Sequence, residues 1–470
     1  MVRKGATRRS VLGGSLASAG ALIAAACGPV QIQRSGQEGG PVGGGDRGKV
    51  TWLVRSTPAE NKGQEQVFEP AIKKALPNIE LERVIVPQAQ YIPKINSMAA
   101  AQESLEIWGF GGNYYDYWWR GLPQDLTPYI NADKWNVNEY FQTGLMDIYK
   151  INNKYYGLSQ LSTYGSMLLY NRDMFDAAGL KPPPVDWEDT SWTVEKMVEY
   201  AQKLTKNWGK PDGEYGVIMA LWLSATSWPY LWGGDAWAKE HYTDFIAQKT
   251  NFNSDAVMQS HQFAYDLIYK HQVSPDPAVA KSLEQVGSPF QTGKVGMVLD
   301  GGWQYWTTSQ IKDFKFGYAA LPRAKDNKNI NFSDFWIMGR WSKNKDAAWK
   351  AMRVLTSVEA TSDYARVSFT PPTPRGSLNA WLTDVSKASG QSIADLTKVT
   401  TGAIEKKRSQ ESPDHIFIQH PKISDTYDQE KAALMNDKEK PAAWVPRVAK
   451  IMDETVKGVY DQFKASRPKD

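Results

Sequence analysis

The segment from residue 49 to residue 108 alternates between patterns typical of strands and patterns typical of helices. Polar and apolar side chains alternate at the start of the segment, as they do in a half-buried strand. Val67 and Leu76 bound a stretch whose apolar residues recur at helical spacing. Strands that alternate with helices predict an α/β fold with a largely parallel sheet. The expected order is strand 49–54, helix 67–76, strand 80–86, helix 92–102 and strand 105–108.

A glycine-rich segment, Gly109–Asn113, follows the third predicted strand. In open α/β sheets ligands bind beyond the carboxyl ends of the strands. We therefore expect Asn113 and the nearby Asp116 to contact a ligand. Tyr114 occupies the position of the third glycine in a dinucleotide-binding fingerprint, which argues against a nucleotide.

The length of the chain predicts more than one domain. About 420 residues follow the N-terminal segment, which is too long for one ordinary core and suits two domains or lobes. Internal repeats of 20–50 residues are absent. Further elements are predicted as helix 195–204, strands 295–299 and 316–321, helix 345–358 and a terminal helix 447–463.

The N-terminus has the layout of an export signal. Basic residues precede an uncharged run of 16 residues, Val11–Ala26, which is too short to span a bilayer. Arg8-Arg9 resembles a twin-arginine signal, although Val11 replaces the usual Phe. Small residues directly before Cys27 resemble a lipobox, in which that cysteine carries a diacylglycerol. An ordinary A-x-A cleavage site is the alternative. Residues 28–48 contain 8 glycines and are expected to form a flexible tether. Residues 27–48 are thus expected to be the lipidated cysteine followed by this tether.

Charge and cysteine content exclude several classes of protein. Four of the 55 basic residues lie in residues 1–26, which contain no acidic residue, so the mature chain balances 51 basic against 51 acidic residues. A neutral chain without a basic cluster argues against binding to nucleic acid. Cys27 is the only cysteine, so the fold has no disulfide. Since no later segment is apolar enough to span a bilayer, the membrane is contacted through the N-terminal lipid only.

Aromatic residues are abundant, with 19 Trp, 22 Tyr and 15 Phe. Much of this content is expected to form core, but several tryptophans lie beside Gly, Pro, Ser or Asn in predicted loops, where they can face a cleft. The sequence contains no H-E-x-x-H, C-x-x-C or G-x-S-x-G motif, and its five histidines are scattered. We therefore expect no metal, no cofactor and no catalytic residue.

Short motifs in a fixed order resemble one known family over roughly residues 50 to 375. The motifs are Tyr156-Gly157-Leu158 with Leu169–Asp173, Ala178–Leu180 with Pro182–Pro184, Trp187 and Trp192-Thr193, Phe290 with Gly293–Met297 and Gly301–Trp303, and Leu321-Pro322 with Ser342–Asn344 and Ala347–Trp349. Ser159 replaces the usual proline of the first motif. This order resembles the extracellular solute-binding proteins of ABC importers, of the sugar-binding, maltose-binding-protein-like type. Residues 380–440 have no clear counterpart.

The resemblance implies a two-lobe, periplasmic-binding-protein-like α/β fold with hinge crossings and a ligand cleft between the lobes. Lobe I is expected to comprise residues 49–162 and 333–368, and lobe II residues 163–332 and 369–470. The implied function is capture of a carbohydrate, expected to be an oligosaccharide, and its delivery to the permease of an ABC importer. The protein is expected to be a monomer that is exported and anchored to the outer face of the cytoplasmic membrane as a lipoprotein.

The family's cleft positions indicate which residues contact the ligand. By resemblance, Trp228 and Trp303 stack on sugar rings, and Tyr305 is the next aromatic residue of the same segment. Stacked aromatic contacts contribute about 0.5–1.5 kcal/mol each beyond burial, so hydrogen bonds must supply orientation and identity. The remaining candidates are Trp232 and Trp336 for stacking, and Asn113, Asp116, Ser166, Asp300 and Asp334 for hydrogen bonds.

Three other functions stay open at this point. The same fold could bind a peptide, a polyol or another small solute. A tethered glycoside hydrolase needs only two carboxylates that flank the scissile bond, and 51 acidic residues do not exclude such a pair. A surface adhesin that holds glycans without an importer is the third.

Overall fold

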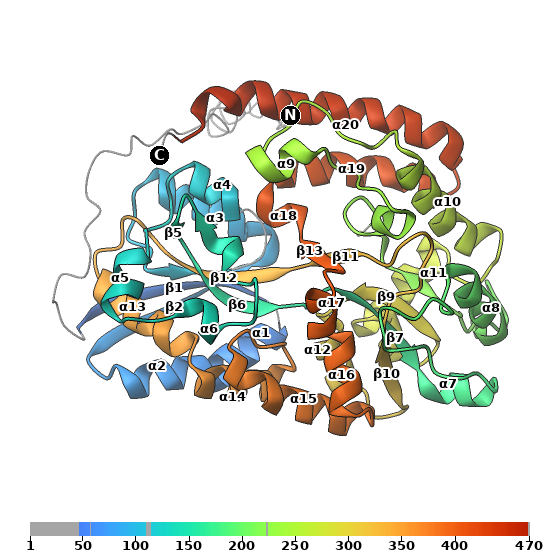
Figure 1. Cartoon of the computed structure of the whole chain (residues 1–470), viewed down its shortest axis with the longest axis horizontal. Helices are drawn as coiled ribbons and strands as arrows, with labels where there is room; N and C mark the ends of the chain where they lie inside the picture. Colours follow the sequence, from blue (N-terminus) through green and yellow to red (C-terminus); the bar gives the residue numbers. More distant parts are fainter. Residues whose placement is uncertain (1–46, 57, 110–113, 222–223, 469–470) are drawn as a thin grey trace, which may run out of the picture.

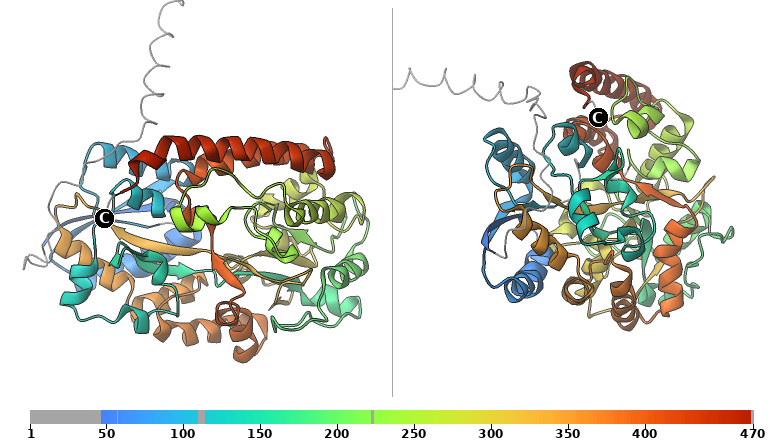
Figure 2. Two further views of the ribbon diagram at one scale, coloured as in Figure 1. Left: turned by 45° about the horizontal axis from the view of Figure 1, so that its top comes forward. Right: turned by 60° about the vertical axis from the view of Figure 1, so that its left-hand side comes forward.

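The computed structural model describes residues 47–56, 58–109, 114–221 and 224–468, and the predicted export signal, Cys27 and Asn113 lie outside these ranges. Two α/β lobes lie side by side, and the long helix α20 (Pro441–Phe463) extends across the top of both (Figure 1). Figure 2 shows α20 from two further directions, and in both it lies beside the segment that contains α9 (Lys239–Asp244) and α10 (Asp255–Tyr269).

Lobe I is built on a five-stranded sheet in the order β2-β1-β3-β12-β6. The strands are β1 (Gly48–Ser56), β2 (Ile79–Pro87), β3 (Ile107–Trp108), β6 (Leu158–Ser162) and β12 (Ser333–Met338). β1 pairs in parallel with β2 and β3, but β12 is antiparallel to both β3 and β6. The sheet is therefore mixed rather than largely parallel, because β12 enters lobe I from the opposite direction after the chain has passed through lobe II.

The helices of lobe I pack an aromatic core against this sheet. The first helical run consists of α1 (Pro58–Gly63), the π-helical turn η1 (Gln64–Phe68) and α2 (Glu69–Ala75). Pro70 lies in the first turn of α2, where a proline is tolerated. Trp52 and Trp336 meet edge to face at 5.7 Å, and Phe68 stacks on Tyr364 at 4.3 Å. The other helices of this lobe are α3 (Gln88–Ala100), α4 (Tyr114–Trp119), α5 (Thr127–Ala132), α6 (Val137–Tyr140), α13 (Lys345–Leu355) and α14 (Val358–Ser368), with the small strands β4 (Lys150–Ile151) and β5 (Lys154–Tyr155).

The helix predicted at 345–358 ends three residues earlier than predicted, and a second helix begins at Val358. The first helix ends at Leu355, and Ser357 then caps α14 by accepting a hydrogen bond from the backbone N–H of Ala360 at 3.2 Å. The terminal helix begins at Pro441, six residues before the predicted start at Arg447. Proline at the first helical position has no N–H to leave unpaired, so it begins this helix well.

Lobe II is built on a four-stranded sheet in the order β10-β7-β9-β8. The strands are β7 (Ser166–Asn171), β8 (Ile218–Met219), β9 (Met297–Gly301) and β10 (Phe316–Ala319). β8 and β9 are parallel, whereas β7 is antiparallel to both β9 and β10. The helices of this lobe include α7 (Arg172–Ala177), α8 (Val194–Leu204), α11 (Pro277–Leu283), α12 (Gln304–Ser309), α15 (Arg375–Ser389), α16 (Ile393–Val399) and α17 (Thr401–Glu405), with the 3-10 turns η4 (Trp228–Trp232) and η6 (Pro289–Thr292).

Two short strands lie where the chain passes between the lobes. β11 (Asn329–Asn331) pairs in parallel with β13 (Ser409–Glu411), and β12 follows β11 directly. Asn331 accepts a hydrogen bond from the hydroxyl of Ser162 at 2.8 Å and donates to the hydroxyl of Ser333 at 2.8 Å. The predicted lobe boundaries, after residues 162 and 332, fall in this region.

The C-terminal helices connect the two lobes on the side of α20. α19 (His420–Met435) and α10 both pack against α20. At the far end, the indole N–H of Trp119 in lobe I donates to the hydroxyl of Ser466 at 3.1 Å. In the part of the chain that the structure describes, no helix combines the length and apolarity needed to cross a membrane, and no three metal-ligating side chains cluster together.

Candidate functional site between the lobes

The indole of Trp303 folds back over the glycine that ends β9. A Cβ atom on Gly301 would lie 2.0 Å from the indole, and one on Gly302 would lie 2.3 Å from the backbone oxygen of Thr163. Both glycines are therefore needed, the first for the indole and the second for the close crossing of two chain segments. Unlike most tryptophans of this chain, Trp303 stays partly exposed.

Asp300 fixes the orientation of this indole. Its carboxylate accepts hydrogen bonds from the indole N–H of Trp303 at 3.0 Å, from the side-chain amide of Gln304 at 2.5 Å and from the backbone N–H of Gly301 at 2.9 Å. The ring of Phe332 meets the indole edge to face at 5.3 Å. The indole of Trp303 is thus held by one carboxylate and one aromatic ring, and part of its surface stays open.

Three polar groups near the start of β7 have no hydrogen-bond partner among the residues that the structure describes. They are the hydroxyls of Ser166 and Ser409 and the side-chain NH2 of Asn329, all shielded from solvent. A Cβ atom on Gly165 would lie 2.6 Å from the side-chain oxygen of Asn329 and 3.4 Å from the hydroxyl of Ser409, so these groups surround one turn. Gly165 has a φ of +104°, which a side chain would strain. Because Ser166 pairs with Gly301 across the sheet, the cluster lies beside Trp303.

A buried ion cluster lies on the lobe I side of the crossing. Arg55, at the end of β1, donates to Glu60 from Nε at 2.6 Å and lies 3.4 Å from the carboxylate of Asp334. Burial alone would lower the pKa of the Arg55 guanidinium, but the two carboxylates outweigh it and raise that pKa. Asp334 lies at a register shift in the pairing of β12 with β6. The predicted candidate Asp334 is therefore engaged by an arginine of its own lobe.

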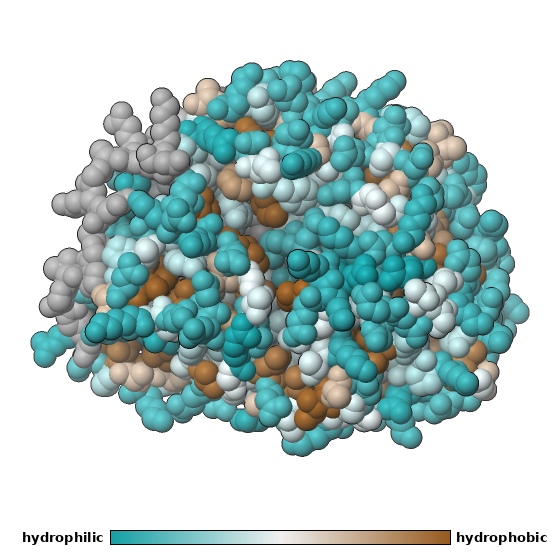
Figure 3. Space-filling view, in the orientation of Figure 1, coloured by the Kyte–Doolittle hydropathy of each residue, from teal (hydrophilic) through white to brown (hydrophobic). Residues whose placement is uncertain are grey.

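The lobes touch on the α20 side. The carboxylate of Asp116, in lobe I, accepts hydrogen bonds at 3.2 Å from both the backbone and the side-chain N–H groups of Gln419. The rings of Tyr115 and Phe245 meet at 4.2 Å, and α18 (Pro413–Ile416) packs against α4. Burial, followed by the charge of Glu411, raises the pKa of the Tyr115 phenol. In the space-filling view the surface is hollowed beside this contact, near the centre of the face, with apolar side chains at its edge (Figure 3).

A family model and a relative match most of the folded chain. The model for the bacterial extracellular solute-binding protein family matches residues 60–362. The chain belongs to this family. A curated relative of this solute-binding protein, named as a binding protein of Brucella abortus (strain 2308), is 24% identical over 314 residues, which are 64% of this chain and 71% of the relative.

Solved structures show the same two-lobe fold. An ABC substrate-binding protein of Listeria monocytogenes in complex with cycloalternan superposes with a TM-score of 0.72 at 18% identity, covering 87% of this chain and 99% of that one. The GacH receptor of Streptomyces glaucescens gives a TM-score of 0.68 at 16% identity, with 87% and 99% covered. A MalE protein of Thermotoga maritima with bound maltose gives 0.65 at 18% identity, with the same coverage.

The solute-binding protein buries four of its five predicted stacking residues. Trp228 and Trp336 are 1% and 0% exposed, and the indole N–H of Trp228 donates to the backbone oxygen of residue 220 at 2.7 Å. Tyr305 packs against neighbouring aromatic rings, and Trp232 packs against Phe263 at 5.3 Å. These four rings present no open face to a ligand in this structure, which leaves Trp303 as the stacking candidate.

Sequence reasoning missed several polar residues of the solute-binding protein. Gln304 is the neighbour of a predicted residue and could have been found from that adjacency. Asn329, Ser409 and Glu411 lie in segments without a family motif, and Glu411 accepts a hydrogen bond at 3.3 Å from the backbone N–H of Ser333. Among the predicted polar residues, Ser166 and Asp300 lie together beside Trp303. Asp116 and Asp334 lie elsewhere, the first paired with Arg120 at 2.9 Å and the second with Arg55 at 3.4 Å.

Proposed function

We propose that this protein captures an uncharged carbohydrate between its two lobes and delivers it to an ABC importer. The observation that carries the proposal is a partly exposed indole beside buried polar groups that lack partners. A flat indole covers the C–H face of a sugar ring, and hydroxyl groups both donate and accept hydrogen bonds. Trp303 supplies the plate, and the hydroxyls of Ser166 and Ser409 and the NH2 group of Asn329 supply the partners.

The cost of leaving polar groups unpaired favours a hydroxyl-rich ligand. A buried polar group without a partner costs about 1–3 kcal/mol. Three such groups in one place therefore suit a ligand or ordered water that satisfies all of them. The NH2 group of Asn329 needs an acceptor, whereas the two serine hydroxyls can donate or accept. A sugar with neighbouring hydroxyl groups meets both needs.

The structural relatives support an oligosaccharide over other solutes. Four of them are complexes with cycloalternan, maltose, mannotriose and maltotriose. One relative is described with tagatose, a monosaccharide. We therefore propose an oligosaccharide as the ligand of this chain.

Calorimetry on the mature protein tests the proposal. Maltotriose, mannotriose and tagatose form the first panel, and short peptides and linear polyols form the second. We expect at least one sugar to bind, and the Ser409→Ala variant to bind it about 5- to 10-fold more weakly because one hydrogen bond to the ligand is lost. Binding by the second panel alone would establish the alternative, a peptide- or polyol-binding protein of the same fold.

A hydrolysis assay tests the enzymatic alternative. The family and the fold are those of substrate-binding proteins, so we propose that the bound carbohydrate is released chemically unchanged. Incubation of the purified protein with the same oligosaccharides should leave the concentration of reducing ends constant. An increase above a heat-inactivated control would establish a tethered glycoside hydrolase instead.

We also propose that the protein is exported, lipidated on Cys27 and held at the membrane by residues 28–48. In cells that process lipoproteins, the wild-type protein should sediment with membranes and incorporate labelled fatty acid. The Cys27→Ser variant should be soluble and unlabelled, with unchanged sugar affinity. A labelled Cys27→Ser protein, or an unlabelled wild type, would contradict the lipobox.

A further inference from the structure

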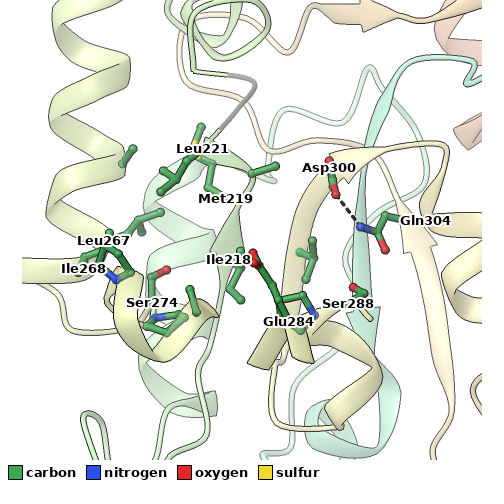
Figure 4. Close-up of a pocket in the computed structure, with 17 residues that line it drawn as sticks. Ile218, Met219, Leu221, Leu267, Ile268, Ser274, Glu284, Ser288, Asp300 and Gln304 are labelled. Atoms are coloured by element: carbon green, nitrogen blue, oxygen red, sulfur yellow. Dashed lines mark hydrogen bonds between the residues drawn. The ribbon is translucent and has the colours of Figure 1, made fainter. Parts of the chain in front are cut away.

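Lobe II contains a cavity whose lining includes none of the three unpaired polar groups around Gly165. It has a volume of about 320 Å³ and lies between the sheet edge formed by β8 and β9 and the helices α10 and α11 (Figure 4). This volume is at the small end of the range for ligand pockets. Its walls are mainly aliphatic, and they include Ile218, Met219, Leu221, Leu267, Ile268 and Val298.

The end of the cavity at β9 carries an unsatisfied acceptor. Gln304 and Asp300 both line the cavity and are 7% and 8% exposed. The NH2 group of Gln304 donates to Asp300 at 2.5 Å, which turns the two residues toward each other as Figure 4 shows. The side-chain oxygen of Gln304 is buried and has no hydrogen-bond partner among the described residues. A ligand at this end must therefore offer a hydrogen-bond donor.

The charge of the lining residues determines which kind of hydrogen-bond donor the cavity favours in a ligand. Of the 17 residues that line the cavity, Asp300 and Glu284 are acidic and none is basic. Asp300 lies at the β9 end, whereas Glu284 is exposed at the α11 side. Two carboxylates without a basic residue in the lining favour a cation over a neutral alcohol. No lining residue is aromatic, so the cage that suits quaternary ammonium groups is missing.

We propose that this cavity binds a small primary ammonium compound with a short aliphatic body. The ammonium group donates to the side-chain oxygen of Gln304 beside the charge of Asp300, and the aliphatic body lies against Leu267 and Val298. The site borders the proposed carbohydrate site, but ligand binding in the cavity does not require that a carbohydrate binds. The two sites share Asp300, which also holds the indole of Trp303, so occupation of the cavity should change the environment of that indole.

Titration of the mature protein with n-butylamine, n-butanol and tetramethylammonium at neutral pH tests the proposal. Calorimetry should detect n-butylamine binding, and the other two compounds should bind at least about tenfold more weakly because each lacks either the charge or the N–H donor. Binding of n-butanol as strong as that of n-butylamine, or no binding of the amine at millimolar concentration, would overturn the proposal.

Two variants on α11 locate the binding. Ala280 lines the cavity, whereas Ala278 on the same helix is exposed and does not. Ala280→Trp should abolish n-butylamine binding, and Ala278→Trp should leave it unchanged. Gln304→Leu removes the acceptor and should weaken binding about tenfold or more. Equal affinity in both tryptophan variants would show that the amine binds elsewhere and would refute the site.

Discussion

Replacement of Trp303 by alanine separates ligand binding from folding. Trp303 is partly exposed, its indole N–H donates to Asp300 at 3.0 Å, and Phe332 contacts its edge at 5.3 Å. The variant removes a plate that a sugar can cover, but it removes little of the lobe II core. We therefore expect a large loss of affinity with a small loss of stability.

The size of both effects follows from the surface involved. An aromatic side chain buries roughly 150–250 Å² in total, so one face of the indole offers about 60 Å² to a sugar. Covering that area stabilises the complex by about 1.5 kcal/mol, and stacking adds about 0.5–1.5 kcal/mol. The expected loss of about 2–3 kcal/mol corresponds to a dissociation constant that is about 30- to 150-fold higher. The unfolding free energy should fall by only about 1–2 kcal/mol, since Asp300 keeps two other donors.

Trp336→Phe is the matched control for Trp303→Ala. Trp336 is 0% exposed and packs edge to face against Trp52. Its variant should lower the unfolding free energy by about 2 kcal/mol through loss of packing, and it should bind sugar within about twofold of the wild type. Calorimetry with the sugar that the wild type binds measures the affinity of each variant, and urea unfolding of the apo protein measures its unfolding free energy. Unchanged affinity in Trp303→Ala, or a weakened affinity in Trp336→Phe, would refute the assignment of these two residues.

Three further expectations follow from single contacts. Gly302→Ala should lower the unfolding free energy by about 1–3 kcal/mol because its Cβ would lie 2.3 Å from a backbone atom. Gly458→Ala, in open space within α20, should raise the unfolding free energy slightly in the same urea assay. Equal effects of the two substitutions would contradict this reasoning. Burial lowers the pKa of His261 from 6.5 to about 4, so the unfolded chain takes up a proton first as the pH falls. Stability should decline by up to about 3 kcal/mol between pH 6.5 and 4, and a His261→Gln variant whose unfolding free energy shows the same pH slope would refute this contribution. Asp116→Ala removes the acceptor of both hydrogen bonds that Gln419 donates across the lobes and should increase the radius of gyration of the apo protein in X-ray scattering, whereas an unchanged radius would show that these bonds do not hold the lobes together.

The regular elements of the fold were predicted well where one face of a strand or helix carries a local pattern. The strand predicted at 80–86 is β2 (Ile79–Pro87), and the helix predicted at 195–204 is α8 (Val194–Leu204). Strand direction was predicted less well, because the partners of β12 come from segments far away in the chain. No local pattern reports which way a returning strand will enter a sheet.

The candidate site was predicted in part. Family motifs indicated the segment around Trp303, where the adjacent glycines and Asp300 are close in sequence. The other stacking candidates, such as Trp336, have the same chemistry but are covered by side chains from remote elements. Ser409 comes from a region without a motif, and only the pairing of β13 with β11 brings it near Gly165.

The sequence by itself determined the membership of the family, the alternation of strands and helices, and the prediction of an exported, lipid-anchored protein. These features depend on short stretches of chain whose chemistry can be read locally. Only the tertiary structure decided which indole keeps an open face, which polar groups lack partners and where the cavity of lobe II lies. The physical reason is that burial and hydrogen-bond pairing depend on what packs against a residue, and in this protein those neighbours come from segments hundreds of residues apart in the chain.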